Sequence, residues 1–130
     1  QVIVDTSAVL AVLFDEPDAE RFTRAIAEAP HCRMSTANFL EAALVVEGRA
    51  GLVGGQELDL FIERAAIELV PVSIEHAQAA RRAWRRFGKG NHSAGLNFGD
   101  CFAYALAEVT GEPLLYKGED FALTDVESAL

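Results

Sequence analysis

Basic residues are scarce in this sequence. It contains 11 Lys and Arg against 20 Asp and Glu, so the formal net charge at pH 7 is −9. A protein this acidic repels nucleic acid as a whole, and any contact with nucleic acid requires a local basic patch or bound cations. The same charge is compatible with a basic partner protein.

Cysteines and long apolar runs are also few. Cys32 and Cys101 lie in apolar surroundings without C-x-x-C spacing, which indicates reduced core thiols and argues against a disulfide framework or a cysteine-based metal site. No apolar run approaches the roughly 18 residues of a membrane span. The first expected strand follows no charged leader, so we expect a cytoplasmic protein without membrane contact; Gln1 suggests a processed start.

Hydrophobic residues make up 51% of the sequence, which excludes disorder and favours one packed core. We therefore expect a single domain over residues 1–130. Short β-branched runs alternate with longer helical patterns, which is typical of an α/β fold with a mainly parallel sheet of about four to five short strands and helices on both faces. The expected strands span residues 2–4, 31–34, 67–72 and 114–116, and the expected helices span 8–14, 19–29, 37–49, 56–66, 74–87 and 97–110.

Asp5 directly follows the apolar run 2–4 and precedes two helix-capping residues, Thr6 and Ser7. It is therefore expected at the carboxyl end of a buried strand and beside a helix N-terminus. In open α/β sheets ligands bind at this position. On this stretch alone a plain helix cap is the better explanation of Asp5, and the other acids decide between the two interpretations.

Glu41 is the most informative of those acids, because it lies in an apolar helix between Leu40 and Ala42. Burying an isolated carboxylate costs several kcal/mol. The helix dipole returns only about 0.3–1 kcal/mol to an acid near an N-terminus. Glu41 therefore requires a cation or a proton.

Asp100 and Asp120 are expected near the same sheet edge as Asp5 and Glu41. Asp100 begins the helix that leads into the last strand, and Asp120 lies in the turn after that strand. Carboxylates that meet in one cleft cannot all remain ionised without a counter-charge. An all-oxygen ligand set suits Mg²⁺ or Mn²⁺ rather than Zn²⁺, and supports metal-assisted hydrolysis of a phosphodiester.

Almost half of the basic residues fall in one short stretch around the helix 74–87. We interpret this stretch as a solvated helix face or as a contact for a phosphate backbone. On the same helix Ala77, Ala80, Trp84 and Phe87 recur at helical spacing and are expected to face the core. The five basic residues are Arg81, Arg82, Arg85, Arg86 and Lys89.

Segments spread over nearly the whole chain resemble the PIN-domain ribonucleases, and more closely the VapC toxins of bacterial toxin–antitoxin pairs. The segments, in order, are VDTSAVLAVL, STANFLEAALVV, NFGDCFAYALA and LLYKGEDFALTD. The resemblance implies a PIN-like fold and an endoribonuclease that requires Mg²⁺ or Mn²⁺ and inhibits translation or growth. It also implies RNA products with 5′-phosphate and 3′-hydroxyl ends, a VapB-type antitoxin that blocks the cleft, and a homodimer.

The resemblance also implies roles for individual residues. Asp5, Glu41 and Asp100 form its acidic core, with Asp5 and Asp100 as direct metal ligands. The family often has its fourth acid where this chain has Gly118; Glu119 and Asp120 follow, and we assign Asp120 to the set. The residues expected to orient these acids or their waters are Thr6, Ser7 and Asn38.

Two other functions are compatible with parts of the sequence. Asp5 could form an aspartyl phosphate in a phosphotransferase, but such sites need a second Asp two residues on, where this chain has Ser7. A non-catalytic RNA- or protein-binding module is the other alternative. It is disfavoured because Asp5, Glu41 and Asp100 are all present.

Overall fold

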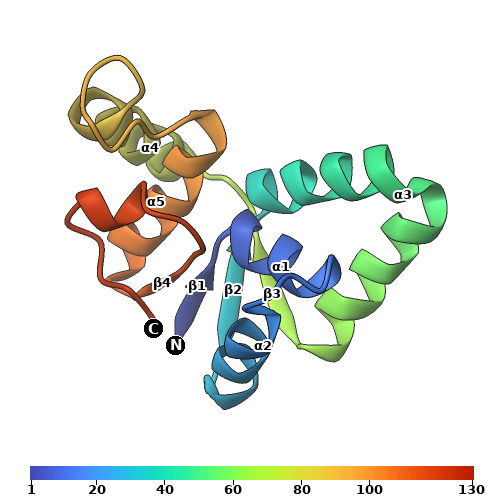
Figure 1. The fold of residues 1–130 in the computed structure, drawn as a ribbon. Helices are drawn as coiled ribbons and strands as arrows, with labels where there is room; N and C mark the ends of the chain where they lie inside the picture. Colours follow the sequence, from blue (N-terminus) through green and yellow to red (C-terminus); the bar gives the residue numbers. More distant parts are fainter.

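The computed structural model describes residues 1–130 and contains a four-stranded sheet with the order β3-β2-β1-β4 (Figure 1). Every strand pair in the sheet is parallel. The strands are β1 (Val2–Val4), β2 (Cys32–Ser35), β3 (Ile67–Val70) and β4 (Leu114–Leu115). The predicted α/β fold with a parallel sheet is confirmed.

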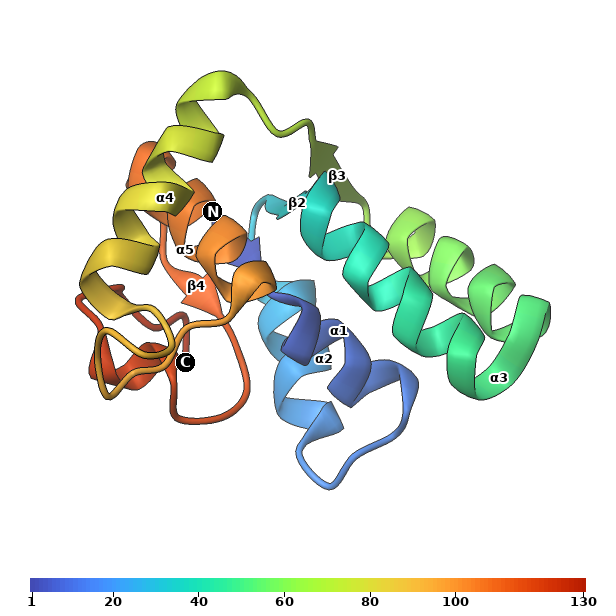
Figure 2. The same ribbon diagram turned by 90° about the horizontal axis from the view of Figure 1, so that it is seen from above.

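Helices cover both faces of this sheet. Helices α4 and α5 lie on one side, and α1, α2 and α3 lie on the other (Figures 1 and 2). The two layers bury separate apolar clusters, one around Ile3 and Leu114 and the other around Val4 and Met34. The helices are α1 (Thr6–Leu13), α2 (Ala19–Glu28), α3 (Thr36–Arg64), α4 (Ile74–Phe87) and α5 (Phe98–Thr110), followed by the short 3₁₀ helix η1 (Phe121–Leu123). No helix is both long and apolar enough to cross a membrane.

The strand β3 lies at the edge of the sheet, a position with which Pro71 near its end is compatible. It ends at Val70 rather than at residue 72 because Pro71 has no N–H with which to continue the ladder. The strand β2 begins at Cys32, one residue later than predicted, and extends to Ser35, which caps α3 by accepting a hydrogen bond from the Ala37 N–H.

Helix α3 forms an arm whose two halves run side by side (Figure 2). The sequence predicted a break between helices 37–49 and 56–66, and the non-helical residue, Gly51 (φ 65°, ψ −161°), lies within that gap. Gly54 and Gly55 are helical and buried. A Cβ at Gly54 would lie 2.7 Å from Ala50 Cβ, so glycine there permits close approach of the two halves.

Helix α4 matches its predicted bounds, but the predicted core face is partly wrong. Phe87 and Ala80 are buried, whereas Ala77 is exposed and Trp84 is 49% exposed. The buried alanines are Ala79, Ala80 and Ala83. Small side chains face α5 because α4 packs closely against it, which turns the larger Trp84 outward.

Candidate active site

Asp5 lies between β1 and α1 and is 3% exposed. Its Oδ2 accepts hydrogen bonds from the Ser7 N–H at 3.0 Å and from the Ser7 hydroxyl at 2.6 Å, so this oxygen caps α1. The other oxygen, Oδ1, is buried and has no hydrogen-bond partner. A buried carboxylate oxygen without a partner is costly, and a proton or a cation would remove that cost.

The pKa of Asp5 reflects this position. Burial raises it from 3.8 to about 7, against the hydrogen bonds from Ser7, which lower it. The charges of Asp100 and Glu41 raise it further. The structure therefore brings these three acids, which are distant in sequence, close enough to repel one another.

Glu41 projects from the second turn of α3 and is held by residues of two elements. The Thr6 hydroxyl donates to Glu41 Oε1 at 2.6 Å, and Asn38 Nδ2 lies 3.4 Å from the same oxygen. Asn38 is fully buried, and its Nδ2 also donates to the Gly99 carbonyl at 2.9 Å. Thr6, Asn38 and Gly99 thus connect α1, α3 and α5 around the carboxylate of Glu41.

Asp100 lies in the first turn of α5, where Asn97 orients it. The Asn97 N–H donates to Asp100 Oδ2 at 3.0 Å, and the Asp100 N–H donates to Asn97 Oδ1 at 2.9 Å. Burial raises the pKa of Asp100 to about 6, the hydrogen bond from Asn97 lowers it, and the charges of Glu41 and Asp120 raise it. The role of Asn97 was missed in the sequence, although N-x-x-D before an apolar run resembles a capping box.

Asp120 is exposed and precedes η1. Its charge contributes to the raised pKa of Asp100, whereas Glu119 is not among the groups that do so. Asp120 is therefore the acid of this turn whose charge acts on Asp100, and its place in the site stays a prediction.

No basic side chain neutralises these acids. None of the ion pairs in the structure involves Asp5, Glu41, Asp100 or Asp120. Lys117 follows β4, but its Nζ binds Glu16 at 2.6 Å and Asp18 at 3.1 Å. The acidic cluster, which we define as Asp5, Glu41, Asp100 and Asp120, is thus left without a protein counter-charge.

The residues of the acidic cluster fit a hard divalent cation. They offer only carboxylate oxygens, and one of these, Asp5 Oδ1, is buried without a partner. As the side chains stand, no group of three or more His, Cys, Asp or Glu residues is arranged to hold a metal ion. Mg²⁺ commonly binds through one or two carboxylates, retains several waters and uses phosphate oxygens of a substrate, so a smaller protein ligand set is sufficient.

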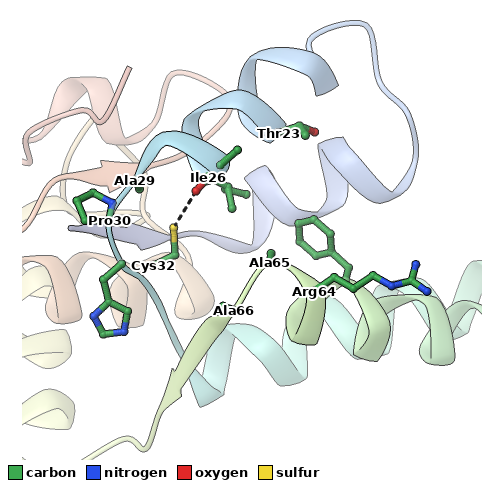
Figure 3. Close-up of a pocket in the computed structure, with 11 residues that line it drawn as sticks. Thr23, Ile26, Ala29, Pro30, Cys32, Arg64, Ala65 and Ala66 are labelled. Carbon is green, nitrogen blue, oxygen red and sulfur yellow. Dashed lines mark hydrogen bonds between the residues drawn. The ribbon is translucent and has the colours of Figure 1, made fainter.

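A cavity lies elsewhere in the molecule, and none of the four acids lines it. It has a volume of about 490 Å³ and lies between the end of α2, the start of β2 and the end of α3 (Figure 3). Its lining includes Ile26, Cys32 and Arg64, and the Cys32 thiol donates to the Ile26 carbonyl at 3.7 Å. Because it adjoins the amino ends of β2 and β3, it is separate from Asp5, which follows the carboxyl end of β1.

The arginines of the predicted basic patch lie on a solvent-exposed face of α4. Lys89 lies just beyond the C-terminus of this helix. Two of its members form ion pairs: Arg86 with Asp125 at 3.2 Å and Arg82 with Glu108 at 3.9 Å. The others form none; these are Arg81, Arg85 and Lys89. Both interpretations, a solvated face and a phosphate contact, remain compatible with this geometry.

The sequence matches the family model of the PIN domain over residues 2–127. It is 60% identical over 126 residues to Ribonuclease VapC30 of Mycobacterium tuberculosis, covering 96% of this chain and 95% of that protein. It is 58% identical to Ribonuclease VapC of Mycolicibacterium smegmatis over 125 residues, covering 96% of this chain and 97% of the relative.

Solved structures share the fold at low sequence identity. The VapC20 toxin of Mycobacterium tuberculosis, which cleaves the sarcin–ricin loop, superimposes with a TM-score of 0.80 at 16% identity, covering 97% of this chain and 96% of that chain. VapBC2 of Rickettsia felis, solved with a promoter DNA fragment, gives a TM-score of 0.77 at 13% identity, covering 98% and 95%. Both similarities show that this chain shares their overall fold.

Proposed function

This chain belongs to the PIN-domain family and, within it, to the VapC ribonucleases, and we propose that its acidic cluster is a divalent-metal site that hydrolyses RNA. The observation that carries this proposal is a set of four acids without a basic partner, in which the charges of Glu41 and Asp100 raise the pKa of Asp5 and those of Glu41 and Asp120 raise the pKa of Asp100. Such a cluster is costly to maintain in a folded protein unless a cation occupies it. It is therefore a functional feature rather than a structural one.

We assign direct binding of Mg²⁺ or Mn²⁺ to Asp5 and Asp100, whose pKa values are both raised. Glu41, fixed by Thr6, is assigned to orient the attacking water, and Asp120 adds negative charge at the exposed side of the cluster. A bound divalent cation would polarise a phosphate oxygen and lower the pKa of that water. The water oxygen would bond to phosphorus as the P–O3′ bond breaks, and the proton that the water loses would balance the one that O3′ takes up, so the products carry 5′-phosphate and 3′-hydroxyl ends.

Ser7 and Asn38 support this arrangement without being assigned to touch the substrate. The Ser7 hydroxyl donates to Asp5 Oδ2 and accepts from the Lys117 N–H at 2.9 Å, which fixes Asp5 between α1 and the segment after β4. Asn38 ties Glu41 to Gly99. Both residues reduce the freedom of the acids they hold.

Cleavage of a mixed cellular RNA pool tests the function directly. We expect the wild-type protein to cut a few sites in Mg²⁺ or Mn²⁺ and none in EDTA. The Asp100→Asn variant retains the capping geometry with Asn97 but loses one anionic ligand, so it should cut none of those sites. Equal cutting by the variant, or cutting in EDTA, would refute the metal-site proposal.

We further propose that the basic side chains of α4 and its C-terminal end that form no ion pair contact the RNA backbone. These residues are Arg81, Arg85 and Lys89. The Arg85→Glu/Lys89→Glu variant should bind RNA more weakly, and the slope of log affinity against log salt should decrease by about 0.7 for each phosphate that the protein no longer neutralises. The matched control is Arg21→Glu/Arg24→Glu on α2, which changes the net charge equally. Binding titrations at several salt concentrations measure both variants, and identical behaviour of the two would mean that α4 makes no specific contact with RNA.

The chain also has exposed apolar surface for protein partners. On α3, Leu40 is 57% exposed and Leu44 is 67% exposed, and they lie on one helical face. We propose that a VapB-type antitoxin covers this face and adds a basic segment against the acidic cluster.

A second apolar surface lies around Trp84 and Phe98, and we propose that two copies of this chain associate through it. Light scattering of the isolated chain measures this homodimerisation.

The aspartyl-phosphate alternative receives no support from the site. Ser7, which stands where such enzymes need a second Asp, donates its hydroxyl to Asp5 Oδ2 instead. Treatment with beryllofluoride should therefore leave Asp5 without an adduct.

A further inference from the structure

Gly99, one residue before Asp100, lies directly against the carboxylate of Glu41. A Cβ built on Gly99 would be 2.1 Å from Glu41 Oε2, 2.6 Å from its Cδ and 2.7 Å from its Oε1. These distances are far below van der Waals contact, and every atom of the carboxyl group is involved. The position that any side chain at residue 99 would occupy is thus already occupied by Glu41.

The backbone conformation at residue 99 does not require a glycine. Its φ is not in the left-handed region, in contrast to Gly51, Gly90, Gly95, Gly111 and Gly118. It lies in the first turn of α5, where alanine is the better helix former. The close approach of Glu41 is the feature that requires the absence of a side chain.

Glu41 has little freedom to move away from an added methyl group. Its Oε1 accepts the short hydrogen bond from Thr6, and Asn38 holds both Glu41 and the Gly99 carbonyl. The flexible end of Glu41 would nevertheless give way before the backbone of α5, because rotation of a side chain requires no change in the helix. Displacement would break the hydrogen bond with Thr6 and remove one charge from the acidic cluster.

We propose that Gly99 is a positioning residue, whose missing side chain provides the space in which the Glu41 carboxylate stands beside Asp100. This inference rests on the proposed metal-dependent function. It assigns to Gly99 no contact with substrate or metal. Its effect is exerted through Glu41.

The test is Mn²⁺ binding by calorimetry to the full chain, compared with thermal unfolding without metal. Gly99→Ala should weaken Mn²⁺ binding at least about tenfold. Its Tm should stay within about two degrees of wild type, because the higher helix propensity of alanine offsets the cost of displacing Glu41. Gly48→Ala is the matched control. Gly48 is also helical and has nothing within 4 Å of an added Cβ, so its Mn²⁺ affinity should be unchanged.

A double variant separates positioning from a general disturbance. Adding Gly99→Ala to Glu41→Gln should cause no further reduction of Mn²⁺ affinity, since the charge that Gly99 positions is already gone. Full additivity of the two changes, or wild-type affinity in Gly99→Ala, would overturn the proposal. If Gly99→Ala fails to fold, Glu41→Ala must restore folding, and continued unfolding would equally overturn it.

This design distinguishes the inference from the function on which it rests. Wild-type protein that binds Mn²⁺ but cuts no RNA would refute the ribonuclease proposal and leave the Gly99 comparison valid. Wild-type protein that binds no Mn²⁺ would refute the metal site, and the Tm cycle of Gly99→Ala with Glu41→Ala would then decide whether the two residues collide. In that cycle Gly99→Ala should raise the Tm only when Glu41 is absent.

Discussion

Asp5→Asn is expected to reduce metal-dependent RNA cleavage by at least about a thousandfold, equivalent to about 4 kcal/mol of transition-state stabilisation. The substitution is nearly isosteric. The amide oxygen of the introduced asparagine can still accept from the Ser7 N–H and hydroxyl, so the cap of α1 survives. Only the oxygen without a partner, Oδ1, is replaced, and this is the atom we assign to the cation.

The measurement is single-turnover cleavage of an RNA that the wild-type protein cuts, with saturating Mn²⁺. Ser7→Ala serves as the comparison, because it removes a hydrogen bond to Asp5 but leaves both carboxylate oxygens in place. It should retain more activity than Asp5→Asn. Cleavage by Asp5→Asn at the wild-type rate would exclude Asp5 from the mechanism and favour a non-catalytic, RNA-binding role.

In the absence of divalent metal, the protein is expected to become less stable as the pH rises from about 4 to about 7. The pKa of Asp5 is 3.8 as an unperturbed group and about 7 in the folded chain, because burial disfavours the ionised carboxylate. Over this interval the folded state holds a proton that the unfolded state has released. Stability is therefore greatest at low pH through this group and is lost as the pH rises through the folded pKa.

The size of this contribution is on the order of 4 kcal/mol, from about 1.4 kcal/mol for each pH unit of difference. Asp5→Asn has no proton to lose, so the difference in unfolding free energy between the two proteins isolates Asp5 from all other groups. We expect Asp5→Asn to be more stable than wild type at pH 8 in EDTA, with the difference vanishing below pH 4. Parallel curves for the two proteins from pH 4 to 8 would show that Asp5 titrates normally.

Divalent metal should reverse this order of stability, so that wild type becomes more stable than Asp5→Asn at pH 8. A cation that binds only the folded state adds stability in proportion to the logarithm of its concentration above its Kd. Protons compete for Asp5 and Asp100, so Mn²⁺ should stabilise the wild-type protein more at pH 8 than at pH 5. In Asp5→Asn, Mn²⁺ should have little effect at either pH. Denaturant titrations of both proteins at pH 5 and pH 8, each with and without Mn²⁺, measure these differences.

The sequence alone determined the order in which strands and helices follow one another along the chain, and it indicated the acids that we propose for the site. Local physics is sufficient for this, because β-branched runs such as Val2–Val4 and capping residues such as Ser73 act on their immediate neighbours. Asp5 was visible as an acid between a strand and a helix. Glu41 was visible as an acid within an apolar run, where only a bound cation or a proton explains it.

The tertiary structure decided how these elements face one another. Helical spacing allowed Trp84 to face the core, but the close packing of α4 on α5 selected the small alanines instead, because Trp84 needs more space than that interface leaves. Gly54 and Gly55, which the sequence placed between two helices, are helical because the two halves of α3 pack closely at Gly54. Such choices depend on partners distant in sequence, which local patterns do not specify.

The same distinction applies within the site. The sequence determined which residues carry carboxylates, and the resemblance to a family suggested their roles. Only the folded chain determines that one oxygen of Asp5 caps a helix while the other lacks a partner, and that Glu41 fills the space beside Gly99. The second is a contact between α3 and α5, and burial in the folded chain is what raises the pKa of Asp5.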